Sequence, residues 1–134
     1  MILKARTAEA SLRVSSQPKP PVPAASGAAT SRMIELMELA AMRLMKPHLR
    51  DGESSVAIEM NLTYKAPNTT MGGAMRAVAA YAGISGRLHR FTINTFDESG
   101  LIGSAKHTRA VVEERQRVAV ARRRGDRSSM SFNV

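Results

Sequence analysis

The sequence predicts an α+β domain in which a curved antiparallel sheet wraps around one long central helix. Three observations predict this fold. The chain has 134 residues, 43% of them hydrophobic, which suffices for one domain with a real core. One segment has helical periodicity and is apolar on most sides, and several later segments alternate between apolar and polar residues and are separated by short turns.

The helix predicted at residues 30–47 organises the rest of the chain. Ten of the thirteen residues from 33 to 45 are apolar, which is typical of a helix that is covered on most sides. Thr30 is expected to cap its start through its hydroxyl. Pro47 is expected to end it, because proline lacks an N–H and clashes with the preceding turn. Glu38 lies off the charged stripe of this helix, so its carboxylate is expected to be either paired or functional.

Alternation of period two predicts the strands. The clearest is at residues 54–64, and residues 88–96 and 101–113 are predicted to be two more. Residues 74–82 fit a helix equally well by period, and their position between two strands favours a strand. A short strand is predicted at residues 8–15. One face of the clearest strand carries Val56, Ile58, Met60, Leu62 and Tyr64, and one face of the 88–96 strand carries His89, Phe91, Ile93 and Thr95.

The connections predict how these strands pair. Proline-rich residues 17–29 are expected to form an extended crossing segment before the helix. The later strands follow one another through short turns, so successive strands are expected to pair antiparallel. A sheet curled around one helix still has free edges, and a second copy of the chain would cover one of them. We therefore expect a homodimer or a dimer of dimers.

The charge of the chain is unevenly distributed. The net charge is +9, from 20 basic and 11 acidic residues, which favours an anionic partner. From Arg115 onward, however, six arginines face one acidic residue, Asp126, so much of the excess lies near the C-terminus. Residues 118–134 are expected to form a flexible, basic tail that frays. Its only aromatic residue is Phe132, which argues against a specific nucleic-acid partner.

Several classes of protein are excluded by what the sequence lacks. There is no cysteine, hence no disulfide framework and no thiolate metal site. No apolar run approaches the roughly 20 residues that span a bilayer, and the first residues lack the apolar middle of a secretory signal. No histidine pair has ligand spacing with carboxylates, so no metal is expected. We expect a cytoplasmic protein without a membrane partner.

Three segments carry a resemblance to a known family. They are AATSRMIELMELAAMRLMKPHL around the helix, VAIEMNLTYKAPNTTMGG around the clearest strand, and GSAKHTRAVV in the last strand. Their order and spacing resemble hotdog-fold thioesterases of the fluoroacetyl-CoA thioesterase type. The resemblance covers residues 8–114. It implies a hotdog domain at residues 8–117, preceded by an extension at residues 1–7 and followed by the tail at residues 118–134.

The resemblance also implies site residues. The family has a Thr followed eight residues later by a Glu, which correspond here to Thr30 and Glu38, and a catalytic His where this chain has Tyr64. A phenol titrates near pH 10, so Tyr64 is a poor base at pH 7, although it can donate a hydrogen bond. In the His-x-Arg of the last strand, His107 and Arg109 are candidates for substrate binding. A structural role for the lone His107 on its strand remains the simpler alternative.

Each remaining site candidate has a second explanation. Gly72 and Gly73 would let the backbone approach the pantetheine arm of coenzyme A, or they form a bulge at a strand start. Glu38 would act as a base or orient the attacking water, or form a salt bridge at the helix edge. Thr30 would place the helix N-terminus near a thioester carbonyl, and Tyr64 would donate to it or simply pack in the core.

These expectations give one principal function and two alternatives. The principal one is an acyl-CoA thioesterase that hydrolyses a small acyl thioester by water attack, with no cofactor beyond the coenzyme A of its substrate. The first alternative is a hotdog module that binds acyl-CoA or another small ligand without turnover, favoured by the missing histidine. The second is a nucleic-acid-associated protein acting through the basic tail.

Overall fold

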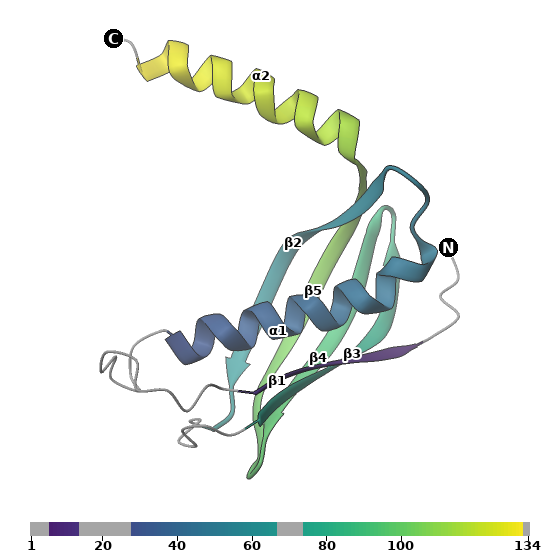
Figure 1. The fold of residues 1–134 in the computed structure, drawn as a ribbon, viewed down its shortest axis with the longest axis vertical. Coiled ribbons are helices and arrows are strands. Elements are labelled where there is room, and N and C mark those ends of the chain that lie inside the picture. Colours follow the sequence, from purple (N-terminus) through teal and green to yellow (C-terminus); the bar gives the residue numbers. More distant parts are fainter. Residues whose placement is uncertain (1–5, 14–27, 67–73, 133–134) are drawn as a thin grey trace.

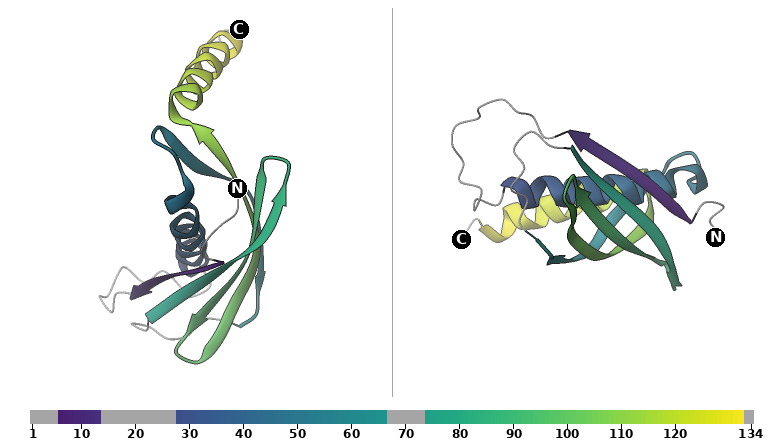
Figure 2. Two further views of the ribbon diagram at one scale, coloured as in Figure 1. Left: turned by 90° about the vertical axis from the view of Figure 1, so that its right-hand side faces the viewer. Right: turned by 90° about the horizontal axis from the view of Figure 1, so that it is seen from below.

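The computed structural model describes residues 6–13, 28–66 and 74–132. It is an α+β fold in which one helix lies across one face of a curved sheet (Figures 1 and 2). No helix among the described residues is long and apolar enough to span a membrane. The elements in chain order are β1 (Thr7–Arg13), α1 (Ala28–Met45), the 3₁₀ turn η1 (Lys46–His48), β2 (Glu53–Tyr64), β3 (Ala74–Ser85), β4 (Leu88–Asp97), β5 (Gly100–Glu113) and α2 (Glu114–Phe132).

The five strands form a single sheet in the order β1-β3-β4-β5-β2, and all neighbours are antiparallel. The predicted pairing of successive strands is confirmed for β3, β4 and β5. It is wrong for β2, which pairs with β5 rather than with β3. The physical reason is that β1 occupies the free edge of β3, so β2 takes the free edge of β5. Strands β1 and β2 are therefore the two edges of the sheet.

The start of α1 differs from the predicted start. The helix begins at Ala28, so Thr30 is its third residue and lies inside the first turn rather than at the cap. The predicted end is confirmed, because the helix stops at Met45 and Pro47 lies in the following 3₁₀ turn. The helix therefore starts two residues earlier than its capping signal suggested.

Within one chain, α1 is covered on one side only. Its buried side chains pack against the concave face of the sheet, and they are Met33, Leu36, Met37, Ala40, Ala41, Leu44 and Met45. Leu39 and Met42, on the other side of the helix, are exposed. The sheet side of this core follows the predicted alternation in β4, where His89, Phe91, Ile93 and Thr95 are all buried. The ambiguous segment is strand β3, not a helix.

Strand β2 departs from its predicted face. A β-bulge lies between Ala57 and Glu59, with Ile58 as the extra residue. Met60, Leu62 and Tyr64 pair with His107, Ala105 and Gly103 and share their face, as predicted. Before the bulge the faces are exchanged, so Val56, which pairs with Ala110, does not lie on this face. Ile58, in the bulge itself, is 53% exposed. Side-chain period alone could not reveal the inserted residue.

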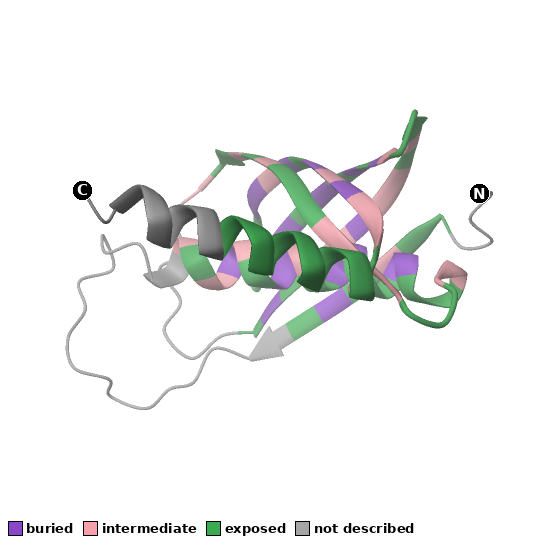
Figure 3. Ribbon diagram, turned by 90° about the horizontal axis from the view of Figure 1, so that it is seen from above, coloured by how far each residue is buried: buried purple, intermediate pink, exposed green. Residues whose placement is uncertain are grey.

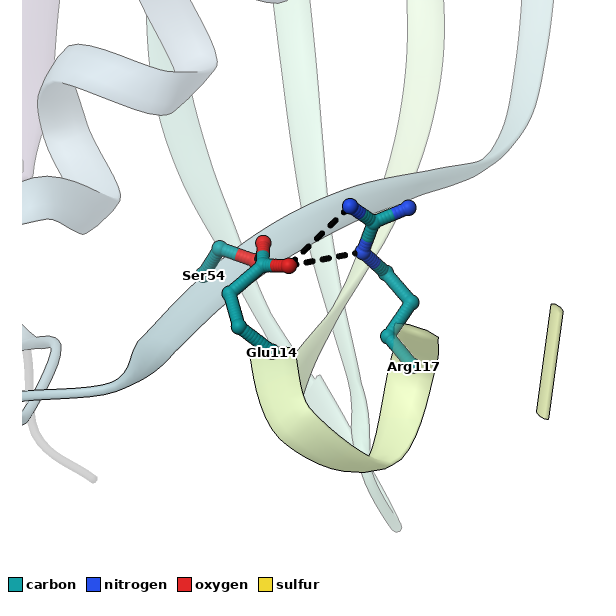
Figure 4. Close-up of polar contacts among 3 residues, drawn as sticks. All are labelled: Ser54, Glu114 and Arg117. Carbon is teal, nitrogen blue, oxygen red and sulfur yellow. Dashed lines mark hydrogen bonds and ion pairs between the residues drawn. The ribbon is translucent and has the colours of Figure 1, made fainter. Parts of the chain in front are cut away.

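The C-terminal segment is a helix rather than a frayed tail. α2 leaves the end of β5 and stands away from the sheet and from α1 (Figure 1). Its side chains from Arg115 to Gly125 are exposed (Figure 3). Its first turn is held by Glu114, which accepts a hydrogen bond from Ser54 and forms an ion pair with Arg117 (Figure 4). Alanine and arginine favour a helix, and no proline interrupts this segment. The high charge of the segment led instead to the prediction of a frayed tail.

Candidate functional site

The site is built on the inner face of β5, under α1. Along this strand Ala105, His107, Arg109 and Val111 point to the same side because strand side chains alternate. His107 is 1% exposed and Arg109 is 3% exposed. Glu38, on α1, is half-buried and acts electrostatically on both of them. The structure thus brings together three of the predicted site residues: Glu38, His107 and Arg109.

Hydrogen bonds fix the imidazole of His107 in one tautomer. Its Nδ1 lies 2.8 Å from the carbonyl oxygen of Glu59, and its Nε2 lies 3.1 Å from Nη1 of Arg109. A carbonyl can only accept and a guanidinium can only donate. Nδ1 therefore carries the proton, and Nε2 accepts from Arg109. The Nε2 lone pair is already engaged, so His107 is not a free base for substrate or water.

Arg109 is anchored on the neighbouring strand. Its Nε donates to Oγ of Ser55 at 2.9 Å, and its Nη2 donates to the carbonyl oxygen of Ser55 at 2.8 Å. A buried cation without hydrogen-bond partners is costly, and these contacts satisfy part of the guanidinium. No signal in the sequence pointed to Ser55, because a serine that alternates with Val56 and shares its side with Glu59 is typical of the solvent face of a strand.

Burial and the charged groups of this cluster shift the pKa values of His107 and Arg109. Burial lowers the pKa of His107, and the positive charge of Arg109 lowers it further, against the raising effects of the hydrogen bond to Glu59 and of the Glu38 carboxylate. Burial also lowers the pKa of Arg109, while Glu38 raises it. Glu38 has no hydrogen bond to any other residue that the structure describes. A carboxylate that is half-buried, near a positive charge and free to accept can bind and orient a water molecule.

Thr30 and Tyr64 lie at a different end of the site. Tyr64 pairs with Gly103, whereas His107 pairs with Met60, four residues away, so Tyr64 is about 13 Å along the sheet from the cluster. Thr30 is about 12 Å along α1 from Glu38. Met33, one turn after Thr30, packs on Gly103, so the start of α1 lies near the end of β2 (Figure 1). Within one chain the trio Thr30, Glu38 and Tyr64 is thus divided in two.

Other predicted features are placed as follows. Gly72 and Gly73 lie outside the described residues. Within the described ranges, no three His, Cys, Asp or Glu side chains are grouped as a metal would need. A shallow hollow of about 550 Å³ opens toward the sheet face opposite α1, and no predicted site residue lines it; among its lining residues are Asn61, Thr63, Lys65, Asn94, Ser104 and Lys106. The cluster of Glu38, His107 and Arg109 and this hollow therefore lie on opposite faces of the sheet.

A second buried histidine, His89, makes a contact that the sequence did not indicate. The hydroxyl of Tyr81 lies 3.0 Å from Nδ1 of His89, and both side chains face α1. Phe91 contacts the ring of Tyr81 edge-on and lies 6.2 Å from the ring of His107, measured between centroids. This row of rings supports the imidazole of His107 from the side of β4.

Solved structures show which fold this geometry belongs to. A hot-dog-like protein from Thermanaerovibrio acidaminovorans superposes with a TM-score of 0.72 at 17% identity, covering 88% of this chain and 89% of that one. A thioesterase superfamily member from Thermus thermophilus superposes with a TM-score of 0.78 at 22% identity, covering 96% and 98%. The chain therefore has the hotdog fold.

Closer relatives specify the family. Residues 16–115 match the sequence profile of the fluoroacetyl-CoA-specific thioesterases. A crystal structure of a mutant of a fluoroacetyl-CoA-specific thioesterase superposes with a TM-score of 0.75 at 27% identity, covering 88% of this chain and 93% of that one. The fluoroacetyl-CoA thioesterase of Streptantibioticus cattleyicolor is 34% identical over 84 residues, which are 63% of this chain and 60% of that protein. The chain belongs to the fluoroacetyl-CoA-specific thioesterase family, although it matches less than two thirds of this last relative.

Proposed function

We propose that this protein hydrolyses an acyl-CoA thioester, with Glu38 as the base or the group that orients the attacking water. The observation that carries the proposal is the half-buried Glu38 carboxylate within electrostatic reach of the buried Arg109. A carboxylate without a hydrogen-bond partner can accept a proton from water as the water attacks. Two mutants of a fluoroacetyl-CoA thioesterase were crystallised, one with fluoroacetate and CoA and the other with acetyl-CoA, which supports a small acyl group.

Thr30 and Tyr64 have supporting roles in this proposal. The first turn of α1 presents unpaired backbone N–H groups, and Thr30 lies within it, so a thioester oxyanion is stabilised there. Tyr64 is 43% exposed and is proposed as a hydrogen-bond donor to the thioester. Gly72 and Gly73 are proposed to line the pantetheine arm. Beyond coenzyme A in the substrate, no cofactor is part of the reaction.

We further propose that the working form is a homodimer joined along β2. This twelve-residue edge strand exposes Ile58, and α1 exposes Leu39 and Met42, which a monomer would leave in water. Antiparallel pairing of two β2 strands about Leu62 would set Tyr64 of the partner subunit opposite Met60, which pairs with His107. The two halves of the trio would then meet across the interface. The lack of cysteine is consistent with a cytoplasmic location.

A thiol-release assay tests the reaction. Coenzyme A release is measured with short, branched and aromatic acyl-CoAs, for the parent and for Glu38→Gln. Turnover of at least one acyl-CoA that depends on Glu38 supports the proposal. Binding of an acyl-CoA by calorimetry without any release of coenzyme A contradicts it.

The alternative is a module that binds acyl-CoA without turning it over. The observation in its favour is the phenol at position 64 together with the engaged Nε2 of His107, which together leave the cluster without a free imidazole. In that case Glu38→Gln would change affinity and nothing else.

A further inference from the structure

Edge strand β2 adopts a register that its own apolar pattern does not favour. A regular strand would place Val56 and Ile58 on the same side as Met60, under α1. The bulge instead leaves Ile58 53% exposed and turns Ser55 toward the helix side, opposite Val111. Burying apolar surface stabilises a fold, so contacts outside β2 must hold this register.

Those contacts come from β5 and bracket the bulge. Before Ile58, Arg109 donates to both the hydroxyl and the carbonyl oxygen of Ser55. After it, His107 donates to the carbonyl oxygen of Glu59. The two clamping side chains are joined to each other by the Arg109–His107 hydrogen bond. A slip of one residue would turn the Ser55 side chain to the opposite face and leave the buried guanidinium without it.

We propose that His107 and Arg109 are positioning residues: together they hold β2 in its bulged register, with Ser55 turned toward the face that carries Glu38 and Val56 turned away. The consequence for activity rests on the proposed function, because the clamp also fixes the positive charge of Arg109 beside Glu38. The consequence for the register of β2 is independent of any activity.

A cysteine reporter tests the register, since the chain contains no native cysteine. Val56→Cys with Ala110→Cys places two thiols on register partners, so mild oxidation should join them in a disulfide. Adding Arg109→Met removes the cation that needs Ser55, so residues 53–57 should slip by one position and bring position 57, not position 56, opposite position 110. The disulfide should then form about tenfold or more slowly, because the slipped strand turns position 56 to the opposite face. Thr63→Cys with Ser104→Cys is the matched control: this pair lies beyond the bulge, so its disulfide should form at an unchanged rate.

Unchanged disulfide formation between positions 56 and 110 in a folded Arg109→Met protein would overturn the proposal. If Arg109→Met does not fold, Arg109→Gln takes its place, because one amide can reach Ser55 or His107 but not both; unchanged disulfide formation there would overturn it equally. In a parent that is active, Arg109→Met should lower kcat more than it raises KM, whereas direct substrate binding by Arg109 would mainly raise KM. A parent without thioesterase activity would contradict the proposed function and leave the disulfide result intact.

Discussion

Arg109 donates a hydrogen bond from Nη1 to Nε2 of His107, two residues before it on the same strand, at 3.1 Å. A neighbouring cation and burial together make protonation of His107 unfavourable. Both residues also hydrogen-bond to β2, so the protonation state of His107 is linked to the position of this edge strand.

Acid should destabilise the protein at mildly acidic pH. Burial lowers the pKa values of both His107 and His89, whereas unfolded histidine titrates near 6.5. Below pH 6.5 the unfolded chain binds more protons than the folded one, so stability is full above this pH and is lost as pH falls through the folded pKa values. Urea unfolding at pH 7.5 and 5.5 should show a smaller free energy of unfolding at 5.5. A flat profile would mean that neither histidine is held neutral.

Replacing Glu38 should affect turnover far more than stability. Glu38→Gln keeps the size of the side chain but removes the base, so turnover should fall at least about tenfold. The carboxylate is only half-buried, so the stability loss should stay within about 1 kcal/mol. Glu35→Gln is the control, since Glu35 is exposed on the same helix and should leave turnover unchanged. Equal turnover in Glu38→Gln and the parent would make Glu38 a structural charge.

Substitutions of Tyr64 distinguish a catalytic role of its hydroxyl from a role in packing alone. Tyr64→Phe keeps the ring and removes the donor, so activity that depends on the hydroxyl should fall by roughly 1–3 kcal/mol in transition-state binding. Tyr64→His should raise activity on a small acyl-CoA, with a pH dependence near 6.5. The comparison is kcat/KM across pH for the three proteins. Full activity in Tyr64→Phe would show that the hydroxyl is idle.

Oligomeric state should depend on the β2 edge. Light scattering at micromolar concentration should give a mass of at least twice the 14.5 kDa of one chain. Ile58→Lys places a charge on the exposed edge strand and should shift the protein toward monomer. Arg87→Lys, in the exposed turn between β3 and β4, serves as a control that should keep the parent mass. A parent mass of 14.5 kDa would remove the dimer from the proposal.

Helix α2 should be dispensable for folding. Its described side chains from Arg115 to Gly125 are exposed, and the Ser54–Glu114–Arg117 contacts precede residue 118. Removing residues 118–134 should leave the melting temperature nearly unchanged. The same truncation should weaken retention on heparin or DNA and flatten its salt dependence, if the arginines bind polyanions. A large fall in melting temperature would show instead that α2 is packed in the assembled protein.

Local patterns predicted most of the elements. The apolar period of α1, the alternation of β4 and the turn residues around the later strands each depend on near neighbours in sequence, and the structure agrees with them. The start of α1 and the state of residues 118–132 were mistaken because capping and charge are weaker signals than the helix propensity they opposed. Of the site, Glu38 stood out because a carboxylate interrupts an apolar helix.

The sequence by itself determined that a long apolar helix is packed on an antiparallel sheet, because the spacing of apolar residues along the chain indicates both the type of element and the face it buries. Only the tertiary structure decided that β2 pairs with β5, because β1 takes the free edge of β3 and leaves only the edge of β5 for β2. Only it decided that β2 is bulged at Ile58. The strand's own alternation favours the regular register, and the need of a buried Arg109 for Ser55, 54 residues away in sequence, outweighs it.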